Sequence, residues 1–281
     1  YGIEARKGFI VITGEVGTGK TTLLKLLMRS ADSVIHTAFV FNPKLDFTGL
    51  LRFILKDFGI DPLSNDKYIL MEQLNDYLIQ QLQMGHIVAL LIDEAQQLSD
   101  GVLEELRLLS NFETEKEKLI QIVLMGQPEL EQRLNRPELR QLKQRVALHC
   151  RLAPLESPEI RQYIDLRLST VGYEGNELFE AKVIDRIAFY SKGIPRLINV
   201  ICDNALLIAY GASKRKVSAE IIEEAASDLQ LTAPPEIERP ATNFNLPNSR
   251  IDKSTDNKQA LSLSVPERRA PLHAVRDMAG L

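Results

Sequence analysis

The sequence predicts an α/β fold of the doubly wound class: a parallel five-stranded sheet with helices on both faces, followed by a small all-helical domain. Two observations support this fold. Up to residue 154, short and almost continuously apolar runs alternate with longer amphipathic stretches, a pattern typical of a parallel sheet covered on both faces. After residue 156 the amphipathic stretches continue, but the short apolar runs stop.

Five apolar runs are expected to form buried strands, because their apolar residues do not alternate with polar ones. They are GFIVIT (8–13), VIHTAFVFN (34–42), HIVALLID (86–93), LIQIVLMG (119–126) and VALHCRL (146–152). Apolar residues at helical spacing predict helices over 21–31, 47–59, 68–85, 99–112, 128–134 and 137–145. Ser99 or Asp100 is suited to cap the fourth of these helices. Pro128 and Pro137 occupy the favoured first position of the last two.

The rest of the chain divides into a helical region and a tail. Four amphipathic stretches after Ser157 predict a helical domain, with boundaries at 155–231 after an α/β domain at 1–154. Residues 232–281 hold nearly half of the 13 prolines and lack apolar periodicity. A disordered C-terminal tail is therefore predicted.

Composition excludes some classes of protein. The formal net charge is -4 and the isoelectric point is about 5.7, which argues against nucleic acid as a partner. The two cysteines have no CxxC spacing, and two reduced thiols are expected. No apolar run approaches the roughly 20 residues that cross a bilayer, so no transmembrane segment is expected. These features predict a cytoplasmic protein, with peripheral association at the inner membrane left open.

The segment GEVGTGKT (14–21) fits the pattern G-x-x-x-x-G-K-[ST] and lies between a predicted strand and a predicted helix. Its glycines let consecutive main-chain N–H groups converge on a phosphate, at a helix end that carries partial positive charge. Lys20 would reach the β and γ phosphates of ATP, and Thr21 would bind Mg²⁺. The predicted nucleotide-binding residues are Gly14, Glu15, Val16, Gly17, Thr18, Gly19, Lys20, Thr21 and Thr22.

The run HIVALLIDE supplies acidic groups for hydrolysis. Asp93 and Glu94 come at the carboxyl end of a predicted strand, where ligands bind in open α/β sheets. Asp93 is suited to bind Mg²⁺, and Glu94 to polarise the attacking water. A pair of this kind could also begin a surface loop, but with the glycine-rich segment it predicts an ATP hydrolase.

Six motifs carry a resemblance to a known family. They are GFIVITGEVGTGKTTLL, LLIDEAQQLS, LEELRLLSNFE, QIVLMGQPEL, LKQRV and GIPRLIN. In this order they resemble the AAA+ ATPases of the general secretion pathway protein A type, and the secretion ATPases linked to exosortase and exopolysaccharide loci. The likeness runs from about residue 1 to 230 and implies a P-loop NTPase domain followed by a helical lid.

The resemblance implies roles for four further residues. Gln127 would orient water against the γ-phosphate, although a polar strand end is the alternative. Asn42 would restrain the catalytic glutamate, or would simply form a turn before Pro43. Arg145 would reach a neighbouring subunit's site, with Arg140 as its competitor and a surface salt bridge as the alternative for either. Arg196 in GIPRLIN would contact the nucleotide from the lid, or would lie in water at a helix start.

Three functions remain open from the sequence. The first is a ring-forming, Mg-dependent ATPase whose subunit and domain rearrangements act on a protein partner in secretion, exopolysaccharide or cell-envelope export. The second is a DNA-binding AAA+ ATPase of the transposition-helper type, which the acidic charge balance disfavours. The third is a nucleotide-gated scaffold that does not hydrolyse ATP. The peptidoglycan-binding domain and membrane span that occur in the family are not expected within these 281 residues, and the adenine contacts are not assigned.

Overall fold

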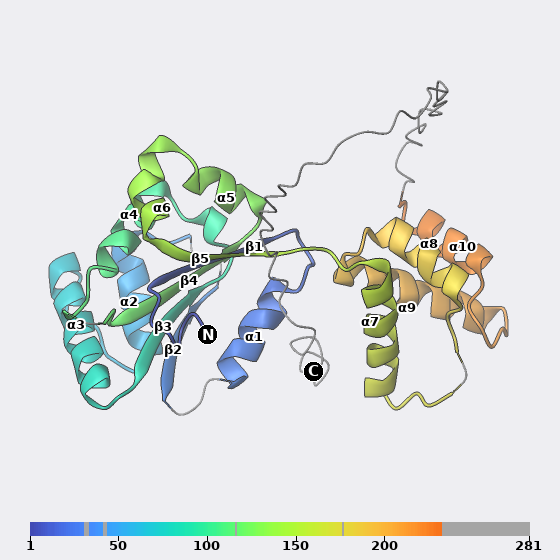
Figure 1. The fold of residues 1–281 in the computed structure, drawn as a ribbon, viewed down its shortest axis with the longest axis horizontal. Helices are drawn as coiled ribbons and strands as arrows, with labels where there is room; N and C mark the ends of the chain where they lie inside the picture. Colours follow the sequence, from blue (N-terminus) through green and yellow to red (C-terminus); the bar gives the residue numbers. More distant parts are fainter. Residues whose placement is uncertain (31–33, 42–43, 116, 176, 232–281) are drawn as a thin grey trace, which may run out of the picture.

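The computed structural model contains a five-stranded sheet flanked by helices and, beside it, a group of four helices (Figure 1). It describes residues 1–30, 34–41, 44–115, 117–175 and 177–231. The predicted tail at 232–281 and Asn42 lie outside the described residues.

The sheet is parallel throughout, and its strand order is β2-β3-β4-β1-β5. Its strands are β1 (Phe9–Gly14), β2 (Ile35–Val40), β3 (Ile87–Ile92), β4 (Ile120–Gly126) and β5 (Val146–Leu152). All five predicted strands are therefore confirmed. The order brings the carboxyl ends of β3, β4 and β1 side by side, because Ile92 pairs with Leu124 and Ile12 pairs with Met125.

Helices connect the strands close to where the periodicity predicts them. They are α1 (Lys20–Ser30), α2 (Phe47–Asp57), α3 (Lys67–Gln83), α4 (Asp100–Leu109), α5 (Pro128–Leu134) and α6 (Arg140–Arg145). Of the two cap candidates for α4, Ser99 is the cap, since its Oγ accepts the Val102 N–H at 3.2 Å. The helix predicted over 137–145 is divided into a 3₁₀ turn, η2 (Pro137–Leu139), and α6. A second 3₁₀ turn, η1 (Ala95–Gln97), was not predicted.

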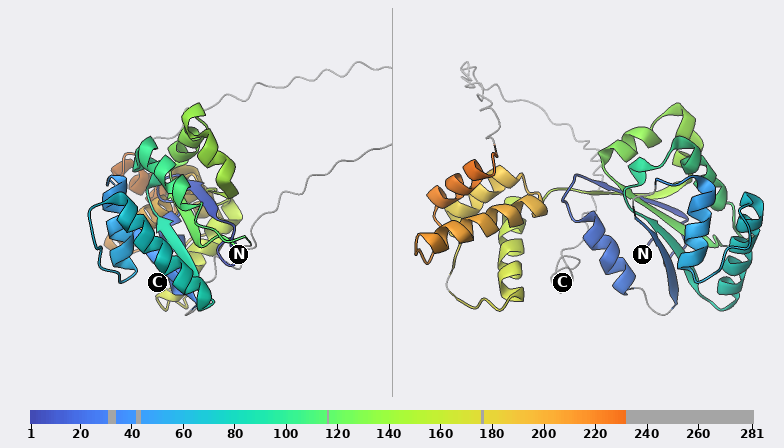
Figure 2. Two further views of the ribbon diagram at one scale, coloured as in Figure 1. Left: turned by 90° about the vertical axis from the view of Figure 1, so that its left-hand side faces the viewer. Right: turned by 180° about the vertical axis from the view of Figure 1, so that it is seen from behind.

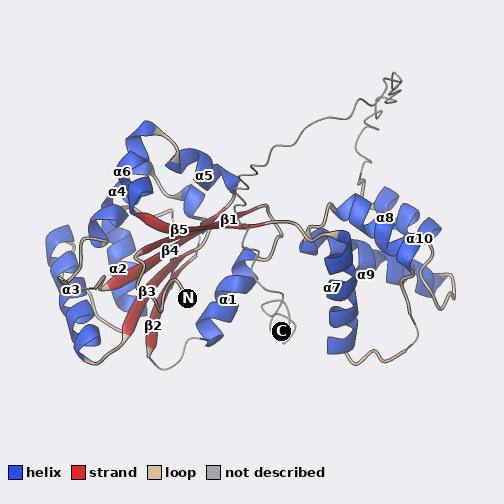
Figure 3. Cartoon of the chain, viewed as in Figure 1, coloured by secondary structure: helices blue, strands red, loops and turns tan. Residues whose placement is uncertain are grey.

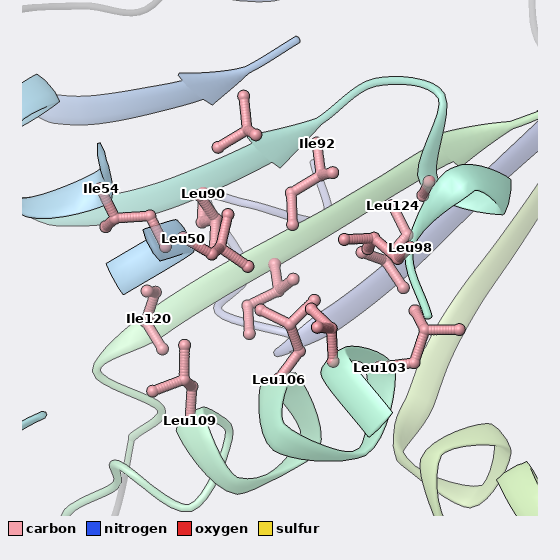
Figure 4. Close-up of a cluster of buried hydrophobic side chains, with 14 of the residues drawn as sticks. Leu50, Ile54, Leu90, Ile92, Leu98, Leu103, Leu106, Leu109, Ile120 and Leu124 are labelled. Atoms are coloured by element: carbon pink, nitrogen blue, oxygen red, sulfur yellow. The ribbon is translucent and has the colours of Figure 1, made fainter. Parts of the chain in front are cut away.

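Both faces of the sheet are buried, which explains why its strands are apolar without alternation. On one face, Leu90 and Ile92 pack with side chains of α2 and α4 (Figure 4). On the other face, Leu91 packs in a smaller cluster with Leu24 of α1. Figure 1 shows α1 on the opposite side of the sheet from α2 to α6. The glycine-rich segment thus turns at the carboxyl end of β1 and leads into α1, which covers the face with the smaller cluster.

The region after the sheet folds around its own apolar cluster. Its helices are α7 (Ser157–Thr170), α8 (Ala181–Ser191), α9 (Pro195–Gly211) and α10 (Ala219–Asp228). Ile160, Ile187, Ile198 and Ile222 are among the buried side chains that the four helices share. An extended segment after β5 leads to them, as Figures 2 and 3 show. No helix in the described part of the chain has both the length and the apolar composition to cross a membrane.

The first turn of α9 contacts the loop that follows β1. The Arg196 main-chain N–H donates to the Gly17 carbonyl oxygen at 3.2 Å. Gly17 has φ +85°, and a Cβ at this position would lie 2.8 Å from Arg196 Cβ and 3.1 Å from Ile194 Cγ2. A glycine is needed here both for the backbone angle and for the close approach of α9.

Gly17→Ala is expected to separate α9 from the loop, and Gly59→Ala serves as its matched control. Gly59 has a similar φ of +79°, but an added Cβ there meets nothing within 4 Å. Both variants should lose about 1 kcal/mol or more of stability through backbone strain, measured by urea denaturation. Only Gly17→Ala should speed hydrogen exchange at the Arg196 amide. Equal exchange in the two variants would contradict this contact.

The two cysteines are expected to differ in reactivity. Cys202 on α9 is buried, and this burial, together with the Asp203 carboxylate, raises the pKa of its thiol to about 12. Cys150 on β5 is exposed. Because the thiolate is the reacting form, a disulfide reagent at pH 8 should label one thiol rapidly in the native protein and both in guanidinium. Cys150→Ser should remove the rapid phase, and two rapid thiols in the native parent would refute the assignment.

Candidate nucleotide-binding and catalytic site

The loop between β1 and α1 surrounds a buried ammonium group. Lys20 is 6 % exposed, and its Nζ donates to the carbonyl oxygens of Gly14 at 2.8 Å and Glu15 at 3.0 Å. Thr18 closes the turn, because its hydroxyl donates to the Glu15 carbonyl oxygen at 2.8 Å. The predicted residues from Gly14 to Thr22 therefore lie together at the amino end of α1.

Opposing electrostatic effects act on Lys20. Burial is the larger effect and lowers the pKa of its ammonium below the usual value. Nearby carboxylates raise this pKa in part, from the largest effect to the smallest Glu94, Asp93, Glu15 and Glu129. Removing a charged group from water disfavours its charged form, whereas opposite charges favour it. The acidic groups of three separate segments therefore lie close enough to Lys20 to act on its charge.

Thr21 and Asp93 join the two sequence motifs. The Thr21 hydroxyl donates to Asp93 Oδ2 at 2.7 Å, across the end of β4. Asp93 is 4 % exposed, and its Oδ1 accepts the Glu94 N–H at 2.9 Å. A hydroxyl and a carboxylate are oxygen donors of the kind that Mg²⁺ prefers in phosphate sites, so this pair fits the metal that the sequence predicts.

Glu94 has an unusual backbone and a fixed side chain. Its φ of 52° and ψ of 37° lie in the left-handed region, which residues with a side chain adopt rarely. Its Oε2 accepts from Gln127 Nε2 at 3.2 Å and from Gln96 Nε2 at 2.5 Å. Gln127 directly follows β4, so the strand order brings this predicted residue beside the predicted catalytic glutamate.

Two residues of this network were missed by the sequence analysis. Gln96 lies in η1, and its only sequence signal is its place two residues after Glu94. Arg133 of α5 donates to the carbonyl oxygens of Gln96 and Leu98, both at 2.6 Å, and pairs with Asp100. It looks like an ordinary helix-surface arginine in the sequence, because its acceptors are main-chain atoms of a distant segment.

The predicted trans-acting arginines lie away from the loop of their own chain. Arg145 ends α6, and the next residue, Val146, pairs with Phe9 at the amino end of β1. The loop follows the carboxyl end of β1, and the two ends of this six-residue strand are roughly 20 Å apart. Arg140 begins α6, and both arginine side chains are exposed. Arg196, also exposed, lies at the loop through its main-chain N–H.

Comparison with known proteins gives a family and a fold. Residues 3–134 match the family model described as an AAA domain. The chain is 41 % identical over 219 residues to general secretion pathway protein A of Aeromonas hydrophila, covering 77 % of this chain and 40 % of that protein. It therefore spans less than half the length of this curated relative.

Solved structures share the fold at low sequence identity. The ORC2 protein of Aeropyrum pernix has a TM-score of 0.58 at 18 % identity, covering 81 % of this chain and 64 % of its own. The RuvB Holliday junction branch migration motor of Thermotoga maritima has a TM-score of 0.54 at 18 % identity, covering 82 % and 66 %. With the parallel sheet and its loop, these findings show that residues 3–134 form an AAA domain, on a fold that these solved structures share, and that the chain is related to general secretion pathway protein A.

Proposed function

We propose that the chain binds Mg·ATP at the loop from Gly14 to Thr22 and hydrolyses it with Glu94 as the general base. One observation carries this proposal: the 2.7 Å hydrogen bond between Thr21 and Asp93. It joins two motifs that are 72 positions apart in the sequence and that have complementary roles in phosphoryl transfer. The adjacent Glu94 then lies beside the same metal-binding pair.

Each side chain of the site has a physical task in this proposal. Main-chain N–H groups of the loop and the Lys20 ammonium bind the phosphate oxygens. Thr21 and Asp93 would hold Mg²⁺, which supplies positive charge to the phosphates when bound. Glu94 accepts a proton from the attacking water, and Gln127, which donates to the same carboxylate, orients that water.

Hydrolysis is proposed to move the helical region relative to the sheet. The first turn of α9 contacts the loop at Gly17, so a change in the loop is transmitted directly to this region. Arg196, at position two of α9, is suited to contact the phosphates from that side. We accordingly assign residues 1–154 to the nucleotide-binding domain and 155–231 to a lid.

We further propose a homo-oligomer that acts on a protein partner of an export or cell-envelope complex, from the cytoplasm or the inner-membrane surface. Arg145 lies at the sheet edge opposite its own loop and is exposed, which suits a residue that completes a neighbour's site. The relationship to general secretion pathway protein A supports a role in export. The proposal includes exopolysaccharide export, because the sequence motifs also resemble the secretion ATPases linked to exopolysaccharide loci.

Two substitutions should separate binding from hydrolysis. Lys20→Ala should weaken ATP binding by about 10- to 100-fold, because the phosphates lose a charged donor. Glu94→Gln should keep ATP affinity but lower kcat by about 100-fold or more, because the amide does not accept a proton. Isothermal titration and a phosphate-release assay measure the two effects. Lys25→Ala, an exposed lysine of α1, is the control. Full turnover in Glu94→Gln would eliminate the hydrolytic assignment.

Mixed oligomers should reveal whether Arg145 acts on the neighbouring subunit. Arg145→Ala and Glu94→Gln subunits are each expected to be inactive alone. Mixed together, they form some sites with an intact Glu94 and a neighbour's intact Arg145, and phosphate release should partly return. The same mixture made with Arg140→Ala is the comparison. If phosphate release returns only in the mixture of Arg140→Ala with Glu94→Gln, Arg140 has the trans-acting role. If neither mixture releases more phosphate than its separate variants, no trans-acting arginine is present at these positions.

A further inference from the structure

The side chain of Gln96 forms a bridge between the catalytic glutamate and the end of β4. Its Nε2 donates to Glu94 Oε2 at 2.5 Å, and its Oε1 accepts the main-chain N–H of Gln127 at 3.2 Å. Both ends of one amide are thus used, one on the carboxylate and one on the β4–α5 turn. A hydrophobic or ionised side chain at this position would lack one end of the bridge or both.

The surroundings of Gln96 fit this bridge closely. Gly126 ends β4, and a Cβ at that position would lie 2.6 Å from Gln96 Oε1. Only a glycine lets the amide approach the turn as it does. The Arg133 guanidinium also donates to the Gln96 carbonyl oxygen at 2.6 Å, so the main chain of η1 is attached to α5.

Glu94 depends on such support. Its left-handed backbone conformation is rarely populated and persists only where neighbouring groups enforce it. Gln96 and Gln127 both donate to Oε2, which fixes the orientation of the carboxylate about its long side chain.

We propose that Gln96 is a positioning residue for ATP hydrolysis: it holds Glu94 Oε2 against the β4–α5 turn and leaves Oε1 to accept the proton of water. This inference rests on the proposed role of Glu94 as general base. It adds a residue that touches neither nucleotide nor metal in that mechanism. It also links Glu94 to α5. The Gln96 side-chain oxygen accepts from Gln127, the residue that precedes α5, and the Gln96 carbonyl oxygen accepts from Arg133 within α5.

The test replaces the amide without changing the length of the side chain. Gln96→Met should lower kcat by about 10- to 100-fold, the effect of losing a charge-assisted hydrogen bond, and should leave the dissociation constant for ATP within about twofold of the parent. Gln97→Met, at the exposed next position of η1, should retain parental kcat. Gln96→Asn keeps an amide that is one methylene too short, and it should lower kcat relative to the parent to a similar extent. This second variant keeps the inference testable where the methionine variant folds poorly.

A double-mutant comparison distinguishes positioning from general destabilisation. In a Glu94→Gln background, Gln96→Met should lower phosphate release no further, because residues that act as a unit are not additive. Parental kcat in both Gln96 variants, or a loss of ATP affinity as large as the loss of kcat, would overturn the inference alone. Parental turnover in Glu94→Gln would overturn the proposed function, and the inference with it.

Discussion

The hydrogen bond between Thr21 and Asp93 is the contact on which the arrangement of the site depends. Thr21 lies in the first turn of α1, which follows β1, and Asp93 follows β3, yet β4 lies between these strands. The two side chains can meet because the parallel strands β3, β4 and β1 end at the same edge of the sheet. The residue after β4, Gln127, is consequently placed beside Glu94, and its side chain donates to that carboxylate.

A polar cluster of this density is costly unless its members satisfy one another. Lys20 and Asp93 are both almost fully buried, and each has hydrogen-bond partners in the loop or on α1. The apolar sheet beneath excludes water from the cluster's base, so the charges interact more strongly than they would at a surface. The same apolar strands that predict the fold therefore also strengthen the electrostatics of the site.

The sequence was sufficient to predict the features that depend on neighbouring residues in the chain. The five strands, most helices and the loop motif have local patterns, and the role of Gln127 was implied by the family resemblance. The division of the helix at 137–145 was missed because Leu139, with φ -101° and ψ 12°, leaves helical geometry under tertiary packing against the core. Gln96 and Arg133 were missed because their partners are set by the order of the strands, which a local pattern does not contain.

Hydrogen bonds at the start of α5 and from Arg133 within it connect Glu94 and η1 to the segment that leads to α6. Arg133 attaches η1 to α5, and Gln96 attaches Glu94 to the turn that starts α5. Six residues after Arg133, η2 ends, and α6 then runs to Arg145. If a neighbour engages Arg145 as proposed, it would act on a short segment whose other end is hydrogen-bonded to Glu94 and to η1. In an oligomer, the segment from 127 to 145 would couple the site that a subunit completes to the site that it contains.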